Sequence, residues 1–199
     1  KDRLYTFGSD SGERRAAQWV LHQVLSTMTR LMAPVLSFTA EEVWQSLKQR
    51  ATDLEDSVFL ASFPEVDAQY YDQALEEKWD NLFMLRNEVN KALEIKRAEK
   101  FLGNSLEAKI VLYLPEKYNM LVSENRDFLP TFFIVSAVEI ADRGFDDSYK
   151  SIEIEGLEVS VERAIGAKCQ RCWNWSEAVG TFTDAPDICD RCHKVIFSR

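Results

Sequence analysis

Cysteine is absent from the first 168 residues of this 199-residue chain, and all four cysteines lie between positions 169 and 192. Secreted, disulfide-bonded proteins more often distribute their cysteines along the whole chain, so this distribution argues against that class. Two close pairs of cysteines are typical of a metal site in a reducing compartment. We therefore expect the chain to be cytoplasmic.

Long apolar runs are also absent, since none approaches the roughly 18 residues that predict a membrane-spanning helix. The first residues, Lys1-Asp2-Arg3, contain no apolar stretch like that of a signal peptide, and no initiator methionine precedes them. We therefore expect a monomeric segment of a longer protein with no membrane partner. A glycine-rich phosphate-binding loop is missing as well, and no residue is assigned a catalytic role.

Basic residues are fewer than acidic ones, and the net charge is −9. Because phosphate binding is mainly electrostatic, this balance taken alone argues against a nucleic-acid partner. The charge is unevenly distributed, however: residues 163–199 hold six basic and four acidic side chains, and much of the acidic excess falls around residues 53–72. An acidic protein can still carry a basic face, so a nucleic-acid partner is not excluded.

Helical spacing of apolar residues predicts three long helices, over residues 12–33, 39–50 and 73–101. Thr39 is a candidate N-cap for the second helix, and Glu42 would complete a capping box with it. Three amphipathic helices of this kind form a bundle, which we expect to occupy residues 1–103.

After Gly103 the apolar period changes to two, which indicates strands. Strands are expected over residues 108–114 and 132–140, with a short helix between them and a hairpin across Glu155-Gly156. The predicted fold is therefore a mainly α-helical bundle, a small mixed α/β unit over residues 104–164 and a four-cysteine tail over residues 165–199.

The cysteines form two C-x-x-C pairs, Cys169 with Cys172 and Cys189 with Cys192, separated by sixteen residues. This spacing is a known zinc pattern, in which two tight turns direct four sulfurs at one ion with Zn–S distances of about 2.3 Å. Four protein ligands close the coordination shell, so the predicted zinc is structural. A segment with so little apolar core is expected to fold only with its metal bound.

Iron and disulfides are the alternatives for these cysteines. A rubredoxin-like iron would use the same four thiolates, and the sequence does not separate it from zinc. Disulfides within each pair would be strained and would require an oxidising compartment.

Basic and aromatic side chains surround the cysteines: Lys168, Arg171, Trp173, Trp175, Arg191 and Lys194. In a purely structural interpretation, the cations offset the net charge of −2 of a zinc tetrathiolate, and a tryptophan covers the metal. In a functional interpretation, an exposed tryptophan stacks on an unpaired base, which contributes about 1–3 kcal/mol, and an arginine pairs with phosphate. The residue chemistry leaves both open.

Five short motifs resemble those of isoleucyl-tRNA synthetases of the bacterial type. They are Lys1–Tyr5, Leu31–Pro34, Phe38–Trp44, Gly103–Ala108, and the cysteine pairs in the contexts Lys168-Cys169-x-Arg171-Cys172-Trp173 and Cys189-x-Arg191-Cys192. The motifs Leu31–Pro34 and Phe38–Trp44 resemble a helical-bundle signature shared by the isoleucine, valine, leucine and methionine class I enzymes. The cysteine motif is similar to the terminal zinc finger of the isoleucine enzymes, whereas the valine enzymes typically end in a coiled coil.

The resemblance implies a function in binding tRNA. Residues 1–103 would be the anticodon-binding bundle, residues 104–164 a junction and residues 165–199 the zinc finger, with isoleucine tRNAs as partner. Arg171 and Trp173 would contact the anticodon. Lys96 and Arg97 on the long helix are candidates for backbone contacts, although a solvated helix face explains them equally well.

The resemblance also implies that the full-length protein is an isoleucine–tRNA ligase that uses ATP. Signatures of the His-Ile-Gly-His and Lys-Met-Ser-Lys-Ser types are missing from this chain, so the ATP, isoleucine and editing sites would lie upstream. The alternative hypothesis is a free-standing zinc ribbon that binds nucleic acid or protein.

Overall fold

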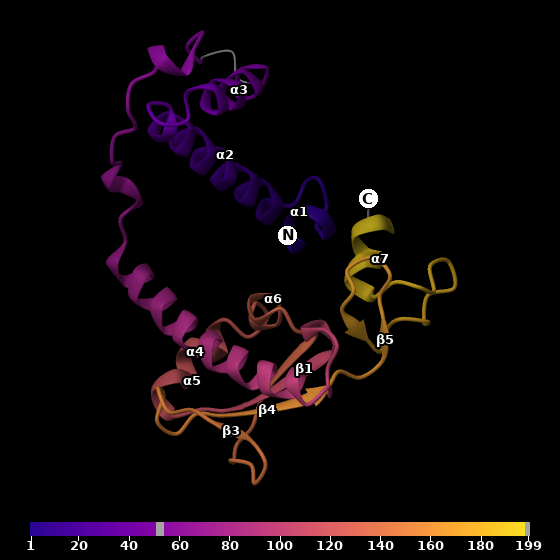
Figure 1. The fold of residues 1–199 in the computed structure, drawn as a ribbon. Helices are drawn as coiled ribbons and strands as arrows, with labels where there is room; N and C mark the ends of the chain where they lie inside the picture. The colour runs from indigo at the N-terminus through magenta and orange to yellow at the C-terminus, as the bar shows by residue number, and fades with distance from the viewer. Residues whose placement is uncertain (51–53, 198–199) are drawn as a thin grey trace. The chain divides into compact units, whose positions relative to one another are not determined.

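The computed structural model describes residues 1–50 and 54–197, which divide into two compact units (Figure 1). The first unit is built from Lys1 and residues 3–71, and the second from Asp2 and residues 72–199. The described residues form seven α-helices, one four-stranded mixed sheet and one two-stranded sheet, with four cysteines near the C-terminal end. The prediction of a mainly helical chain with a small mixed sheet is confirmed. Across the described residues, no helix has both the length and the apolar content needed to span a membrane.

The first unit contains three α-helices and two 3-10 helices: α1 (Asp2–Thr6), α2 (Gly12–Met32), α3 (Ser37–Lys48), η1 (Val58–Leu60) and η2 (Ala68–Tyr70). Helices α2 and α3 pack against each other, and η1 contacts both. Trp44 and Val58 are buried in the small core between them. The indole N–H of Trp44 donates to the carbonyl of Glu55 at 2.9 Å, which satisfies the buried ring nitrogen.

The capping box predicted at Thr39 and Glu42 was wrong. Helix α3 begins two residues earlier, at Ser37, because the amides of Val35 and Leu36 donate back to the carbonyl of Met32 and turn the chain at once. Leu36 occupies the N-cap position without a side-chain hydrogen bond. Thr39 therefore lies inside the first turn of the helix and not at the N-cap position, so its hydroxyl does not cap the helix.

Helix α2 forms where the sequence predicts it, with Ser11 as its N-cap. Its apolar stripe is partly exposed, with exposed fractions between 37% and 53% for Leu21, Val24, Leu25, Met28, Leu31 and Met32. Among the described residues of the first unit, the stripe is therefore not covered as a bundle core would be.

The second unit is a four-stranded sheet with helices packed on it. Its elements are α4 (Gln73–Ala98), η3 (Ser105–Glu107), β1 (Ala108–Tyr113), α5 (Glu116–Glu124), α6 (Leu129–Phe133), β2 (Ala137–Ile140), β3 (Tyr149–Lys150), β4 (Glu158–Arg163), β5 (Ala167–Lys168), β6 (Trp175–Ser176) and α7 (Asp190–Phe197). The strand order is β2-β1-β4-β3, with β1 parallel to β2 and antiparallel to β4. This arrangement places the start of β1 beside the start of β2 and the end of β4.

Helix α4 packs against β4 and α6 of its own unit. Its buried residues, Leu82, Leu85, Val89, Ala92 and Leu93, belong to the same core cluster as the strands. The boundary between compact units therefore lies at Tyr71 and Asp72. The division at residues 103 and 164 stays a prediction about domains.

Two strand predictions needed correction. Of the strand expected over residues 132–140, only β2 forms, because Pro130 sits at the first positions of helix α6 and favours it. Ile134 then ends that helix in the left-handed conformation, with φ at 59°. The hairpin across Glu155-Gly156 exists, but its first arm is β3, which lies before the alternating residues Ile152 and Ile154 that were expected to form it.

A buried carboxylate joins α4 to the β3 region. Glu88 is 1% exposed and accepts hydrogen bonds from the hydroxyls of Tyr149 at 2.9 Å and Ser151 at 2.5 Å, and from the ammonium of Lys91 at 2.6 Å. Burial acts to raise the pKa of Glu88, but the hydrogen bonds from Lys91, Ser151 and Tyr149 outweigh it and lower the pKa below its ordinary value. The ionised carboxylate therefore stabilises the packing of α4 on the sheet.

Replacing Glu88 with Gln is expected to lower the free energy of unfolding of the second unit by about 1–3 kcal/mol at neutral pH, because three donors lose their anionic acceptor. A lowered folded-state pKa contributes stability above the pKa of the unfolded chain, and this contribution disappears as pH falls through the folded value. The difference between the two proteins should therefore shrink below about pH 4. Urea-induced unfolding, followed through NMR signals of β1 and β4, measures both effects.

The matched control is Glu94→Gln on the same helix. Glu94 is exposed, and its ion-pair partner among residues 1–50 and 54–197 is Arg97, one turn further on. An exposed pair of this kind contributes less than about 1 kcal/mol. Equal destabilisation by the two variants would contradict the structural role of Glu88.

Candidate metal centre and nucleic-acid interface

The four cysteine sulfurs converge on one point, all within 4.8 Å of one another. Cys169, Cys189 and Cys192 are buried and Cys172 is partly buried. The sulfurs of Cys172 and Cys189 are 3.7 Å apart. This separation is too long for a disulfide, and it matches the edge of about 3.8 Å that a tetrahedron with Zn–S bonds of about 2.3 Å requires. The residues present therefore fit a tetrathiolate metal site.

The first pair lies on a tight turn between β5 and β6, which pair as a two-stranded antiparallel sheet. The amide of Trp173 donates to the carbonyl of Cys169, and the amide of Cys169 donates to the carbonyl of Asn174, both at 2.9 Å. Trp173 adopts the left-handed conformation, with φ at 68°. Glycine is required at Gly166, because a Cβ there would lie 2.3 Å from the backbone of Ser176.

The second pair lies at the start of α7. Cys189 immediately precedes the helix and Cys192 lies in its first turn, where the amide of His193 donates to the carbonyl of Cys189 at 2.9 Å. The His193 ring stacks on Phe182 with centroids 4.0 Å apart and contacts Phe197 at 4.6 Å. The three rings contact one another in series along α7, whereas the buried core of the segment consists of Cys169, Cys189 and Cys192, with Val179 and Ile188 packed against them.

Polar donors face the sulfurs. The amide of Cys189 donates to the sulfur of Cys169 at 3.3 Å, and the guanidinium of Arg171 donates to the sulfur of Cys192 at 3.4 Å. Such donors stabilise thiolates, which are the metal-binding form of cysteine.

The sulfurs also perturb one another. The hydrogen bond with Cys189 lowers the pKa of Cys172 to about 4. The same bond raises the pKa of Cys189, and burial raises the pKa of Cys192 to about 11. Four sulfurs this close hold their negative charges together most readily around a cation.

The structure places most of the predicted tRNA-binding residues around this cysteine cluster. Trp173 is 57% exposed, and the ammonium of Lys168 lies 5.2 Å from the centre of its ring. Trp175 is partly buried in β6, and on α7 Arg191 is partly buried while Lys194 is exposed. Arg171 points at a cysteine sulfur, so it has a structural contact whether or not it also meets a nucleic acid.

Lys96 and Arg97 lie elsewhere, in the last turn of α4. Lys96 pairs with Glu99 at 2.9 Å, and Arg97 pairs with Glu94. Basic side chains at this position also offset the negative end of the helix dipole. Their surroundings therefore favour the solvated helix face over a phosphate contact.

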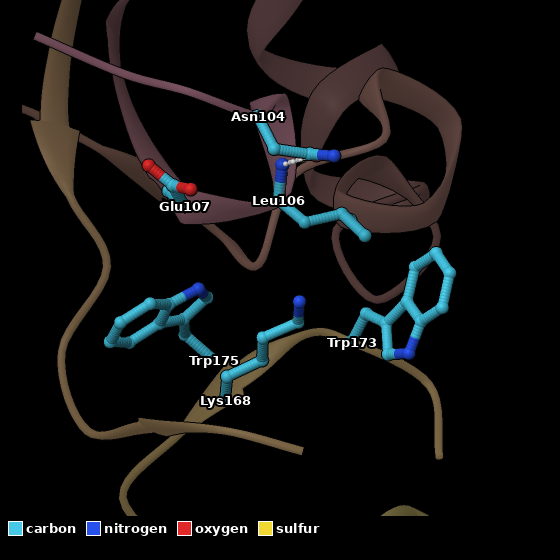
Figure 2. A pocket seen from close by; sticks show the side chains of 6 residues that line it. All are labelled: Asn104, Leu106, Glu107, Lys168, Trp173 and Trp175. Atoms are coloured by element: carbon cyan, nitrogen blue, oxygen red, sulfur yellow. Dashed lines mark hydrogen bonds between the residues drawn. The ribbon is translucent and has the colours of Figure 1, made fainter. Parts of the chain in front are cut away.

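A small cavity of about 20 Å³ lies where the cysteine segment meets the turn before β1 (Figure 2). Lys168, Trp173 and Trp175 line one side of it, and Asn104, Leu106 and Glu107 of the η3 turn line the other. Figure 2 shows the Lys168 side chain extending between the two indole rings towards the turn. The sequence prediction missed the three turn residues as part of this site. The only signal was the Gly103–Ala108 motif, about 60 residues before the cysteines.

Comparison with known proteins supports the prediction from the motifs. Residues 1–112 match the family model described as the anticodon-binding domain of tRNA ligase. The isoleucine–tRNA ligase of Syntrophotalea carbinolica is 43% identical over 200 residues, which cover 100% of this chain and 21% of the relative. Those of Persephonella marina and Kosmotoga olearia are 41% and 43% identical, covering 96% and 98% of this chain and 20% and 21% of the relatives.

The chain thus spans about one fifth of the length of these curated relatives. The match to the family model covers more than half of the chain and includes all of the first unit together with α4 and most of β1. By that extent of similarity, the chain belongs to the anticodon-binding domain family of tRNA ligases.

Proposed function

We propose that this chain is the tRNA-binding C-terminal portion of an isoleucine–tRNA ligase. The observation that carries the proposal is the joint presence, in one chain, of the anticodon-binding domain and of a four-cysteine cluster with an exposed tryptophan and a lysine beside it. The names of the relatives, at about 40% identity over the whole chain, support isoleucine as the amino acid. In this proposal the chain docks the anticodon stem-loop of isoleucine tRNAs, and the rest of the ligase, in the cytoplasm and as a monomer, attaches isoleucine using ATP.

Within this function, the helices of residues 1–103 form the anticodon-binding bundle and residues 104–164 form a junction. The amphipathic character of α2 supports the bundle, because its exposed apolar stripe requires a cover. The alternative of a free-standing zinc ribbon is disfavoured, since the anticodon-binding match lies outside the cysteine segment.

The cysteine segment contributes an aromatic and cationic surface. An exposed indole offers a face on which an unpaired base stacks, and the ammonium of Lys168 beside it offers a charge for phosphate or for a base oxygen. No catalytic residue is assigned to this chain. Its residues bind and orient the tRNA, while the bonds to isoleucine form elsewhere in the ligase.

A single structural zinc is the metal we propose for Cys169, Cys172, Cys189 and Cys192. The ion, when bound, supplies a cross-link between the β5–β6 turn and α7. The donor set of four thiolates and the closed shell support a structural rather than a catalytic ion.

Purified under reducing conditions, the chain is expected to contain one zinc ion. Chelation is expected to remove amide-exchange protection from residues 165–197 while leaving β1 and β4 protected, because the segment has little apolar core besides its cysteines. Hydrogen exchange with mass spectrometry, together with elemental analysis, measures both outcomes. A chain without stoichiometric metal, or a segment that is still protected after chelation, contradicts the proposal. Stoichiometric iron in place of zinc would instead favour the rubredoxin-like centre.

Trp173→Ala in the full-length ligase is expected to raise the KM for tRNA about 5- to 150-fold, the equivalent of 1–3 kcal/mol of lost stacking. Isoleucine-dependent ATP–pyrophosphate exchange, which needs no tRNA, should be unchanged. Trp173→Phe keeps an aromatic face and should restore most of the affinity. Elemental analysis of both variants serves as the control for an intact metal site, and an equal loss of exchange and charging would count against the proposed function.

A further inference from the structure

The hydroxyl of Ser136 connects three segments that are distant in the sequence. Ser136 immediately precedes β2, and its backbone amide donates to the carbonyl of Ala108 at 3.0 Å. Its Oγ donates to the carbonyl of Leu106 at 2.5 Å and accepts from the backbone amide of Trp175 at 2.7 Å. A serine hydroxyl can donate one hydrogen bond and can also accept, and Ser136 does both here.

The two partners of this hydroxyl belong to opposite walls of the cavity in Figure 2. Leu106 lies in η3, whose neighbours Asn104 and Glu107 line one wall. Trp175 lies in β6, and its side chain lines the other wall with Lys168 and Trp173. One hydroxyl therefore links the turn to the face of the cysteine segment that carries the exposed indole.

The side chains of Asn104 and Glu107 do not link the η3 turn to the cysteine segment, because their hydrogen bonds lie within the turn. The amide oxygen of Asn104 accepts from Leu106 at 2.9 Å, and the carboxylate of Glu107 accepts from Gly103 at 3.0 Å. Both bonds stay within the turn, so they make it rigid without attaching the cysteine segment to it.

The covalent connection between β4 and β5 restrains the cysteine segment only in part. The amide of Ala164 donates to the carbonyl of Glu107 at 2.8 Å, which anchors the end of β4. The next two residues are Ile165, which is 63% exposed, and Gly166, which has φ at 95°. Because the exposed Ile165 contributes little buried packing to this connection, a tether beyond this point has a positional effect.

We propose that Ser136 is a positioning residue for tRNA recognition. Its hydroxyl holds the Trp173–Lys168 face of the cysteine segment against the η3 turn, so that the nucleic acid meets one surface formed in advance. A surface held in its binding geometry avoids the entropy cost of ordering it during association. The inference rests on the proposed function, but it concerns a residue outside the cysteine segment that acts through the position of Trp173 and Lys168.

Ser136→Ala removes the donor and the acceptor together. In this chain, the exchange rate of the Trp175 amide is expected to rise at least about tenfold while one zinc ion remains bound. In the full-length ligase, the KM for tRNA is expected to rise at least about threefold with kcat unchanged, since the surface is intact but no longer held in place. Ser136→Thr keeps the hydroxyl and should restore both the slow exchange and the low KM.

Ser160→Ala is the matched control. Ser160 lies in β4 of the same sheet, and within the described part of the chain its hydroxyl makes no hydrogen bond. It should leave the Trp175 amide and the KM for tRNA unchanged, so that a general effect of losing a hydroxyl from the sheet is separated from the loss of the tether.

The outcomes distinguish this inference from the proposed function. Binding of an anticodon stem-loop hairpin by the wild-type ligase is measured in the same series, and its absence sinks the proposed function. Binding that is present and unaffected by Ser136→Ala overturns only the role of Ser136, as does an unchanged Trp175 amide or a failure of Ser136→Thr to rescue. Faster exchange and a raised KM, both rescued by Thr, support it.

Discussion

The convergence of four cysteine sulfurs within 4.8 Å is the constraint on which the C-terminal segment depends. Among the described residues of this segment, the buried cluster consists of three of the cysteines themselves, with Val179, Ile188 and Cys172 packed beside them. A core of this size cannot offset the conformational entropy of about thirty ordered residues. In the proposed zinc site, one ion cross-links the β5–β6 turn to α7 and is the physical basis for an ordered surface in this part of the chain. The exposed Trp173 and the adjacent Lys168 lie on that surface.

The sheet of the second unit gives this surface a fixed neighbour. Parallel pairing of β1 with β2 brings the start of β2 beside the start of β1, and antiparallel pairing of β4 brings its end to the same edge. The η3 turn, Ser136 and the entry to the cysteine segment meet at this edge as a consequence. Helix α4 packs on β4, and its buried Glu88 accepts hydrogen bonds from Tyr149 of β3 and from Ser151 just after it. These contacts stabilise the β4–β3 half of the sheet. The acidic net charge of the chain does not oppose a nucleic-acid surface here, because residues 163–199 carry more basic than acidic side chains.

The sequence pattern predicted correctly those elements whose conformation is determined by residues close to them in the chain. Helix α2 and strand β1 lie where periodicity placed them, and the two C-x-x-C turns bring their sulfurs together as their spacing suggested. The errors arose where neighbours in space decide. Phe132 and Phe133 have the composition of a strand, but the position of Pro130 and the packing of α6 on α4 make them helical. The apolar face of α4 is equally compatible with packing in a helical bundle and with packing on a sheet. The sequence of an amphipathic helix does not say which of the two covers it.

Ser136 was beyond sequence prediction for a related reason. A single serine before a strand has no pattern, and its two hydrogen-bond partners are 30 and 39 residues away. The η3 side chains that line the cavity are likewise joined to the tryptophans only by the fold. A motif shows which residue types are present; whether they share one site depends on strand order and register.

The order of the C-terminal segment depends most directly on the identity and coordination of the proposed metal. X-ray absorption at the zinc edge of the purified chain measures both. A zinc tetrathiolate should give a single shell of four sulfur neighbours at about 2.3 Å. Nitrogen or oxygen neighbours in place of sulfur, or an absorption edge belonging to another metal, would contradict it.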